Sequence, residues 1–322
     1  MTLNNEQKTF CDKALESILG DNYQQFLGSL DAVAGTGKTF TLNVLIAKLK
    51  TAGKKIFSAA YAGIAGTLLI GGSTFHSQTN APQEPTIDMV LGIERNTEKC
   101  KRIMEADVFV FDESSQKHKW YLEAFDCLLR ELTRIDLPFG KKHVVMGSDY
   151  GQCLPIVERA TQATQFKMSI KQSELWGKFK KYKLTKNERC ADENWRNLLL
   201  KVRSGNYTSD LDRYINLPQD ITECNINADE IQDKMVKFVY KGIEDNYEDP
   251  GWFKNRCILC PHNESSANMN DRVMDLIPGE ETISYSADSP TTNEEYDDVP
   301  VEFLNSLNYP GYPKHSLRLK KI

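Results

Sequence analysis

Residues 31–40, Asp-Ala-Val-Ala-Gly-Thr-Gly-Lys-Thr-Phe, have the side-chain types and the spacing that bind phosphate. Small residues allow successive backbone N–H groups to converge on phosphate oxygens, and Gly35 and Gly37 provide them. Lys38 supplies positive charge for the outer phosphates, and Thr39 supplies a hydroxyl for Mg²⁺. The stretch therefore predicts a nucleotide-binding loop.

Two adjacent carboxylates, Asp112 and Glu113, follow the apolar run at residues 108–111. This run is typical of a strand that is buried on both faces of a parallel sheet. The carboxyl end of such a strand is where a Mg²⁺-holding carboxylate is needed, so Asp112 is the candidate. Glu113 is then placed to polarise a water molecule. We favour nucleotide hydrolysis over the alternative that both acids only solvate a loop.

Phosphate binding alone leaves molecular switches, kinases and motors open, because all three classes use such a loop. A guanine-reading Asn-Lys-x-Asp motif does not occur in the sequence, which argues against a GTP switch. A small-molecule kinase is not expected to need a second α/β domain. A motor ATPase is the interpretation that remains.

Apolar patterning predicts the elements that position these residues. Strands are expected over four segments and a helix directly after the loop, and this alternation is typical of an open, doubly wound α/β domain. The predicted strands are residues 26–33, 55–60, 108–111 and 143–146, and the helix is residues 40–50. A largely polar stretch at about residues 77–100 reads as a small insertion.

A second α/β unit is expected after residue 190, so the predicted domains are residues 1–190 and 191–322. Helices at 194–203 and 266–276 and strands at 256–260 and 317–322 are predicted for this part of the chain.

Composition limits the function classes. The chain has 322 residues, 40% hydrophobic residues, a formal net charge of −5 and a pI of about 5.7. This charge argues against coating nucleic acid by bulk attraction but leaves room for a local basic groove, for which Lys178–Lys183 is a candidate. No apolar run approaches the roughly 20 residues that span a bilayer, so no membrane partner is expected. The Cys257 and Cys260 pair reads as part of a strand rather than a zinc site, because a second pair is missing.

In order along the chain, six short segments resemble motifs of the Pif-type (petite integration frequency) DNA helicases of superfamily 1, including the helicase segment of Helitron transposons. The segments are residues 3–7, 62–66, 71–77, 111–118, 147–155 and 184–189, in addition to the phosphate-binding loop. Gln116 stands where the family usually has Met, and Gly151 stands where it usually has another residue.

The resemblance implies a set of site residues. The implied nucleotide-binding residues are Gln7, which would read adenine, and Ala34, Gly35, Thr36, Gly37, Lys38, Thr39 and Phe40. The implied catalytic residues are Lys38, Asp112, Glu113, Gln152 as γ-phosphate sensor and Arg189, which would reach the γ-phosphate; Thr39 and Asp112 would hold the metal. The implied DNA contacts are Gly63, Thr74, Phe75 and His76, and either Phe75 or Tyr150 would stack on bases.

The resemblance also implies a fold and an activity. The fold would be a RecA-like P-loop NTPase domain, a parallel sheet flanked by helices, followed by a second RecA-like domain that is incomplete here. The activity would be ATP hydrolysis with Mg²⁺, coupled to 5′ to 3′ translocation on single-stranded DNA or at single/double-strand junctions. A monomeric motor is implied, in the nucleus or, as for other members of the family, in mitochondria, with roles in DNA repair, recombination or telomere maintenance.

The family continues beyond the strand predicted at residues 317–322 into motifs that are absent from this sequence. We therefore expect nucleotide binding to survive in this chain and processive unwinding to be impaired. The alternative is a non-catalytic ATP-binding clamp or adaptor on DNA. ATP turnover measured with and without single-stranded DNA separates the two.

Overall fold

The computed structural model describes residues 2–152, 155, 157, 160–205, 228–260, 262–289, 300–307 and 314–320. The chain divides into two compact units, Met1–Asn216 and Leu217–Ile322. Each unit is described by itself below.

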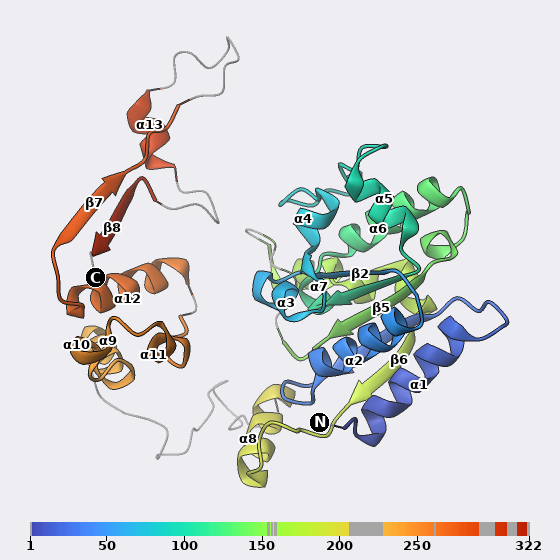
Figure 1. The fold of residues 1–322 in the computed structure, drawn as a ribbon, viewed down its shortest axis with the longest axis horizontal. Helices are drawn as coiled ribbons and strands as arrows, with labels where there is room; N and C mark the ends of the chain where they lie inside the picture. The colour runs from blue at the N-terminus through green and yellow to red at the C-terminus, as the bar shows by residue number, and fades with distance from the viewer. Residues whose placement is uncertain are drawn as a thin grey trace. The chain divides into compact units, whose positions relative to one another are not determined.

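The first unit is built on a six-stranded sheet in the order β3-β2-β4-β5-β1-β6, and every neighbouring pair is parallel (Figure 1). The strands are β1 (Leu27–Ala32), β2 (Ile56–Ala60), β3 (Ser73–Thr74), β4 (Val108–Asp112), β5 (His143–Ser148) and β6 (Lys180–Leu184). Strands β4 and β5 are buried along their whole length. This is the pattern expected for central strands of a parallel sheet with both faces covered.

Two apolar layers cover the sheet, one on each face. Val108 and Val110 of β4 pack with helices α1 (Asn5–Leu19) and α2 (Lys38–Thr51), which lie across one face of the sheet in Figure 1. Phe109 and Phe111 point the other way and pack with α6 (Lys119–Thr133). Alternate residues of one strand thus supply both cores, as the period of two in a strand requires.

The remaining helical elements of the first unit are short. They are α3 (Gly63–Leu68), α4 (Phe75–Thr79), α5 (Glu98–Glu105), η1 (Ser114–Gln116), η2 (Pro138–Lys141), α7 (Gln162–Met168), η3 (Ile170–Gln172), η4 (Glu174–Lys178) and α8 (Glu193–Ser204). Residues 80–97, inside the segment that reads as an insertion, contain no helix or strand. This segment is anchored by the Tyr121 hydroxyl, which hydrogen-bonds the carbonyl oxygens of Pro82 at 2.7 Å and Gln83 at 2.8 Å.

The basic cluster Lys178–Lys183 forms the edge strand β6 and the residues before it. Lysines on an edge strand discourage pairing with another chain. Lys181 also lies over the ring of Trp176, with Nζ 3.4 Å from the ring centroid, and its burial there lowers the pKa of the amine to about 8. Edge protection is thus one role for these lysines, and the basic groove predicted here stays a prediction.

The first unit extends beyond the boundary predicted at residue 190. Helix α8, predicted as the start of the second domain, lies within the first unit, and its Arg203 forms an ion pair with Asp149 at 2.5 Å. The segment before α8 is also tied down, because the Glu6 carboxylate accepts hydrogen bonds from the backbone and side chain of Thr185 at 2.7 and 2.6 Å. Apolar patterning finds the helix but not the contacts that place it in a unit.

The second unit contains helices and one pair of strands. The helices are α9 (Ala228–Val239), α10 (Ile243–Asn246), α11 (Pro250–Lys254), α12 (Asn263–Leu276) and α13 (Val301–Ser306). Strand β7 (Glu281–Tyr285) pairs with β8 (Ser316–Lys320) in antiparallel orientation. Arg318 of β8 binds the carboxylates of Glu281 at 2.6 Å and Asp275 at 2.7 Å.

The strand predicted at residues 256–260 is wrong. The residues there have no regular secondary structure, and Leu259 is 89% exposed. Its apolar pattern resembled a buried strand, but no described strand pairs with it. Cys257 and Cys260 are free thiols, and the described residues contain no group of three His, Cys, Asp or Glu side chains placed to hold a metal.

Candidate active site

The loop between β1 and α2 has the backbone geometry that receives phosphate. Gly35 and Gly37 have φ values of +84° and +80°, which only glycine adopts without strain. The Thr36 hydroxyl donates to the Val33 carbonyl oxygen at 2.7 Å and tightens the turn. Helix α2 starts at Lys38 with no side-chain cap, so its first N–H groups face the loop, and such a helix start favours anions.

Lys38, Thr39 and Asp112 converge in front of this loop. The Lys38 ammonium lies 2.7 Å from Oδ1 of Asp112 and 2.5 Å from Oε1 of Glu113. The Thr39 hydroxyl donates to Oδ2 of Asp112 at 3.0 Å. One carboxylate therefore contacts both the lysine and the hydroxyl that the sequence assigns to phosphate and Mg²⁺.

Glu113 has two features that fit a reacting group. Its backbone is in the left-handed region with φ +53°, which is uncommon for a residue with a side chain. Its Oε2 is buried and has no hydrogen-bond partner within the described part of the chain. Oε1 is held by Lys38, so Oε2 is the oxygen that a further ligand can engage.

A cavity of about 350 Å³ joins these groups. It is lined by the phosphate-binding loop, the start of α2 and the ends of β4 and β5, namely by Ala32, Val33, Ala34, Gly35, Gly37, Lys38, Thr39, Phe40, Glu113, Asp149, Gln152 and Arg189. Gln152 and Arg189, far apart in the sequence from Lys38, thus meet it at one cavity. Gln7, Thr36 and Asp112 lie behind this lining.

Asp149 also lines this cavity, and the sequence analysis did not single it out as a site residue. It is 2% exposed, and Gln152 donates from Nε2 to its Oδ2 at 3.1 Å. The signal was present in the sequence, because Asp149 directly follows a buried strand, as Asp112 ends another.

Gln7 lies against the phosphate-binding loop rather than in the cavity. Its side chain is buried: Nε2 donates to the Thr36 carbonyl oxygen at 2.9 Å, and Oε1 accepts from the Asn4 N–H at 3.0 Å. A Cβ placed on Gly37 would come within 2.6 Å of this Nε2. Both ends of the amide are engaged, so the structure assigns Gln7 a role in supporting the loop, and the predicted adenine contact stays a prediction.

The four predicted DNA contacts lie near one another at the end of β3 and at α3. Gly63 is exposed at the first turn of α3, and Thr74 caps α4, its hydroxyl accepting from the Ser77 N–H at 3.2 Å. His76 is half-buried, with Nε2 3.3 Å from the Tyr121 hydroxyl. Burial lowers the pKa of His76.

The expectation that Phe75 stacks on bases is wrong. Its ring is 1% exposed and packs edge-on against Phe111 and Phe125, with centroids 5.7 and 5.9 Å away. Phe75 is a core residue because α4 turns it inward onto the sheet. Tyr150, the other residue predicted to stack on bases, is half-buried, and burial raises the pKa of its hydroxyl to about 12.

Lys117 is a second residue that the sequence reading missed. Its ammonium lies 3.5 Å from the centroid of the Phe75 ring and 4.5 Å from that of Phe111. It is buried and has no hydrogen-bond partner among the described atoms, and burial holds its pKa well below the ordinary value. Among the described residues, the faces of the Phe75 and Phe111 rings are what the amine contacts.

The donor set fits a magnesium-bound triphosphate. Loop N–H groups and Lys38 suit phosphate oxygens, and the Thr39 hydroxyl with the Asp112 carboxylate suits Mg²⁺. Because few protein carboxylates are present, the remaining Mg²⁺ ligands would be phosphate and water oxygens, which is usual for this ion.

The model of the PIF1-like helicase family matches residues 2–213. The chain belongs to this family. It is 27% identical over 260 residues to the ATP-dependent DNA helicase Pif1 of Psychrobacter sp. (strain PRwf-1), a match that covers 80% of this chain and 36% of the relative. It is 28% identical over 206 residues to the ATP-dependent DNA helicase PIF1 of Danio rerio, covering 61% of this chain and 30% of the relative. The chain thus spans about a third of the length of these relatives.

Solved structures of the family share the fold. The Pif1 helicase from Bacteroides in complex with ADP-AlF3 and ssDNA has a TM-score of 0.65 at 21% identity, over 90% of this chain and 61% of that one. Pif1 helicase from Candida albicans has a TM-score of 0.66 at 21% identity, over 99% of this chain and 64% of that one. These likenesses confirm the predicted α/β class with its RecA-like sheet, and the match to the family model confirms the resemblance to Pif-type helicases.

Proposed function

We propose that the first unit binds and hydrolyses Mg·ATP and that the chain works as an ATP-dependent DNA helicase. The observation that carries this proposal is the convergence of Lys38 and Thr39 on Asp112, at 2.7 and 3.0 Å, in front of the phosphate-binding loop. Membership of the PIF1-like helicase family supports the same reading.

Each side chain has a task in this proposal. Lys38 neutralises phosphate charge, and Thr39 and Asp112 would hold Mg²⁺, which supplies charge stabilisation at the phosphates. Glu113 orients and polarises the attacking water. Because Lys38 now binds Glu113 at 2.5 Å, phosphate competes for Lys38 and releases the carboxylate for this task.

Two further residues complete the proposed site. Gln152 senses the γ-phosphate, and Arg189 stabilises the transferring charge. Both line the cavity beside the loop. The Arg189 guanidinium makes no hydrogen bond or ion pair within the described residues. No carboxylate among them therefore competes with a phosphate for this side chain.

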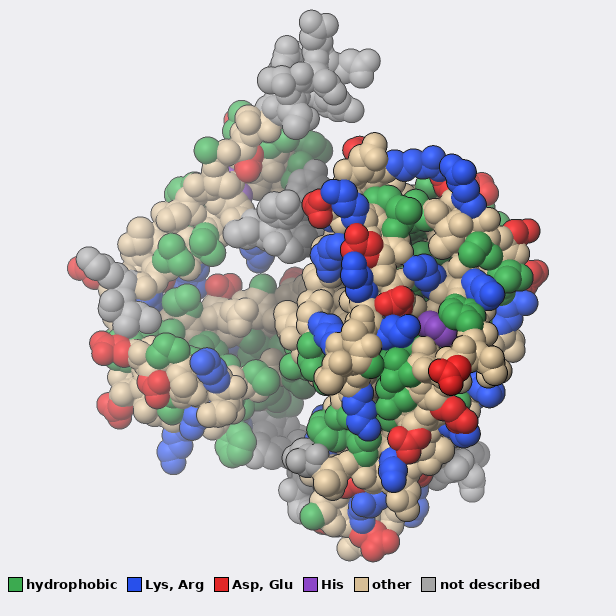
Figure 2. All heavy atoms as spheres, turned by 45° about the vertical axis from the view of Figure 1, so that its right-hand side comes forward, with side chains coloured by type: hydrophobic (Ala, Val, Ile, Leu, Met, Phe, Trp, Pro, Cys, Tyr) green, Lys and Arg blue, Asp and Glu red, His purple; other side chains and the backbone are tan. Residues whose placement is uncertain are grey.

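The proposed DNA partner is a single strand or a single/double-strand junction, with movement from 5′ to 3′. Related Pif1 structures are described as bound to ssDNA and at forked dsDNA. Figure 2 shows basic and acidic side chains interspersed over the visible face of the larger unit, which fits local contacts better than bulk attraction. Opening each base-pair step costs about 1.4 kcal/mol on average, so strand separation needs the energy of ATP.

By the family resemblance we also propose a monomeric motor located in the nucleus, with a role in DNA repair, recombination or telomere maintenance. Light scattering of the purified chain tests the monomer, and imaging of a fluorescent fusion tests the location. The described residues include no helix that is both long and apolar enough to span a membrane.

The deciding experiment measures ATP turnover with and without a single-stranded oligonucleotide. The parent chain should hydrolyse ATP faster when the oligonucleotide is present. Glu113→Gln should keep ATP binding and lose about 100-fold or more of the turnover, because it retains a partner for Lys38 but cannot polarise water. Glu105→Gln, at an exposed residue that pairs with Lys55, is the matched control and should behave as the parent.

One outcome contradicts the motor, and another contradicts only the role of Glu113. ATP binding by the parent without turnover supports the non-catalytic clamp or adaptor instead. Equal turnover by Glu113→Gln and the parent would remove Glu113 from the chemistry.

A further inference from the structure

We propose that Arg203 of α8 positions the sensor Gln152 by holding Asp149, and that Gly151 is needed because it leaves room for the Arg203 guanidinium. This inference rests on the proposed function, because it concerns how the site reads the γ-phosphate. Arg203 would act through Asp149 and is therefore a positioning residue.

Asp149 organises the loop that carries Gln152. Its Oδ1 accepts the Gly151 N–H at 3.0 Å and the Arg203 Nη2 at 2.5 Å, and its Oδ2 accepts the Gln152 Nε2 at 3.1 Å. One carboxylate thus fixes both the backbone of the loop and the sensor side chain. Any shift of Asp149 moves Gln152 with it.

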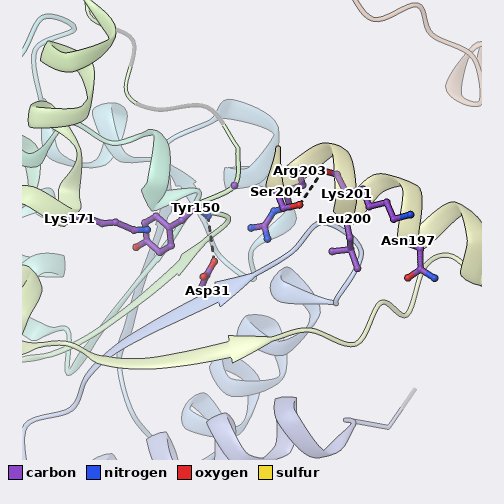
Figure 3. A pocket seen from close by; sticks show the side chains of 9 residues that line it. Asp31, Tyr150, Lys171, Asn197, Leu200, Lys201, Arg203 and Ser204 are labelled. Atoms are coloured by element: carbon purple, nitrogen blue, oxygen red, sulfur yellow. Dashed lines mark hydrogen bonds between the residues drawn. The ribbon is translucent and has the colours of Figure 1, made fainter. Parts of the chain in front are cut away.

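Arg203 is the partner that makes this burial tolerable. The Asp149 side chain is 3% exposed, and a buried carboxylate is costly unless a cation and hydrogen bonds compensate it. Figure 3 shows the Arg203 side chain extending from α8 toward Tyr150, the residue after Asp149, beside a cavity of about 630 Å³. Lys171 also lines this cavity, but among the described residues it is Arg203 that pairs with Asp149.

Gly151 leaves the space that the guanidinium fills. A Cβ at position 151 would lie 2.0 Å from Nε and 2.4 Å from Cζ of Arg203. Any side chain there must displace the guanidinium, since the two cannot overlap. The observed position of the Arg203 guanidinium therefore requires glycine at position 151, where the family usually has another residue.

This arrangement couples the nucleotide to helix α8. Helix α8 is the last described element of the first unit before the chain continues into the second. If γ-phosphate binding depends on the position of Gln152, then it depends on Arg203, and by linkage the bound nucleotide biases α8 in return.

The test compares the affinities for ATP and ADP, measured with fluorescent analogues of both nucleotides. Gly151→Ala and Arg203→Ala should each lower the preference for ATP over ADP by about fivefold or more, with ADP affinity unchanged. The double variant should lose no more than either single variant, because both remove one contact. Arg203→Lys should retain part of the preference.

Gly177→Ala is the matched control, because a Cβ there meets nothing within 4 Å. It should keep the parent preference. Unchanged preference in both Gly151→Ala and Arg203→Ala would overturn the role of Arg203, as would equal losses for ATP and ADP or losses that multiply in the double variant.

The same nucleotide titrations distinguish a failure of the proposed function from a failure of this inference. A parent that binds neither nucleotide contradicts the nucleotide site itself, and the inference falls with it. A parent that prefers ATP but does not turn it over contradicts only hydrolysis, and the preference still reports on Arg203.

Discussion

The Lys38 ammonium lies 2.7 Å from Asp112 even though β5 separates the two strands from which these residues emerge. The contact passes over Gly147 of β5, where a Cβ would come within 3.0 Å of Asp112 Oδ1 and 3.4 Å of Lys38 Cδ. The bare backbone at Gly147 therefore allows the phosphate-binding lysine and the acidic residue to meet across an intervening strand.

Gly147→Ala should separate these groups. The new methyl would also lie 2.7 Å from Leu42 Cδ1, so we expect a loss of about 1–3 kcal/mol in the free energy of unfolding and weaker ATP binding. Urea unfolding and nucleotide titration measure the two effects, with Gly177→Ala as control. Parent-like ATP affinity in Gly147→Ala would mean that the contact across β5 is dispensable.

Gln7→Ala distinguishes a base-reading residue from a support for the loop. In the structure Gln7 holds the Thr36 carbonyl oxygen, so the variant should lose affinity for ATP and GTP by similar factors and lower the free energy of unfolding by about 1–2 kcal/mol. Competition titrations with both nucleotides measure this. Loss of ATP affinity with GTP affinity intact would instead support the predicted adenine contact.

Phe75→Leu tests the reassignment of Phe75 to the core. The change should lower the free energy of unfolding by about 1 kcal/mol and leave single-stranded DNA affinity unchanged, because the ring is buried. A stacked ring would contribute about 1–3 kcal/mol per base to binding. Fluorescence anisotropy with a labelled oligonucleotide decides, and a tenfold loss of affinity in a folded Phe75→Leu chain would restore the stacking role. His76→Ala, at a half-buried neighbour, is the comparison for a direct contact.

Lys117→Met should stabilise the chain at neutral pH. The folded state holds the Lys117 pKa well below its ordinary value, so the unfolded chain binds the extra proton between the two pKa values. Stability of the parent therefore rises with pH up to about 10.4 and falls as pH drops toward the folded pKa. The variant lacks this dependence, so its advantage, about 1–3 kcal/mol, should shrink as pH rises.

Urea unfolding of both chains between about pH 6.5 and 9.5 measures that advantage, because the whole of this range lies below the ordinary lysine pKa. Lys119→Met, at the first residue of α6, controls for the loss of a lysine charge. An advantage that is the same at every pH would show that Lys117 is not held neutral.

Apolar patterning was sufficient for the central sheet. The runs at residues 108–111 and 143–146 became β4 and β5, because strands buried on both faces are apolar throughout. The same rule failed at residues 256–260, where a short apolar run has no described partner strand. The apolar pattern shows that a segment could be a buried strand, but the segment becomes one only where a neighbouring strand pairs with it.

The loop chemistry was readable because its residue types are adjacent in sequence. Gly35, Lys38 and Thr39 stand within five positions, so spacing alone defines their geometry. Arg203 and Asp149 are far apart in the sequence, and only the fold of α8 onto the first unit brings them together. Phe75 was misread for a related reason, since motif order does not say which way a side chain points.

The central claim is that Lys38 and Asp112 serve one magnesium-bound triphosphate. ATP affinity measured with and without Mg²⁺ tests it most directly. The parent should bind ATP about tenfold or more tightly with Mg²⁺, Asp112→Asn should lose that gain and keep its Mg²⁺-free affinity, and Lys38→Ala should lose affinity in both conditions. Parent-like ATP binding by Lys38→Ala, or an undiminished Mg²⁺ gain in Asp112→Asn, would contradict the account.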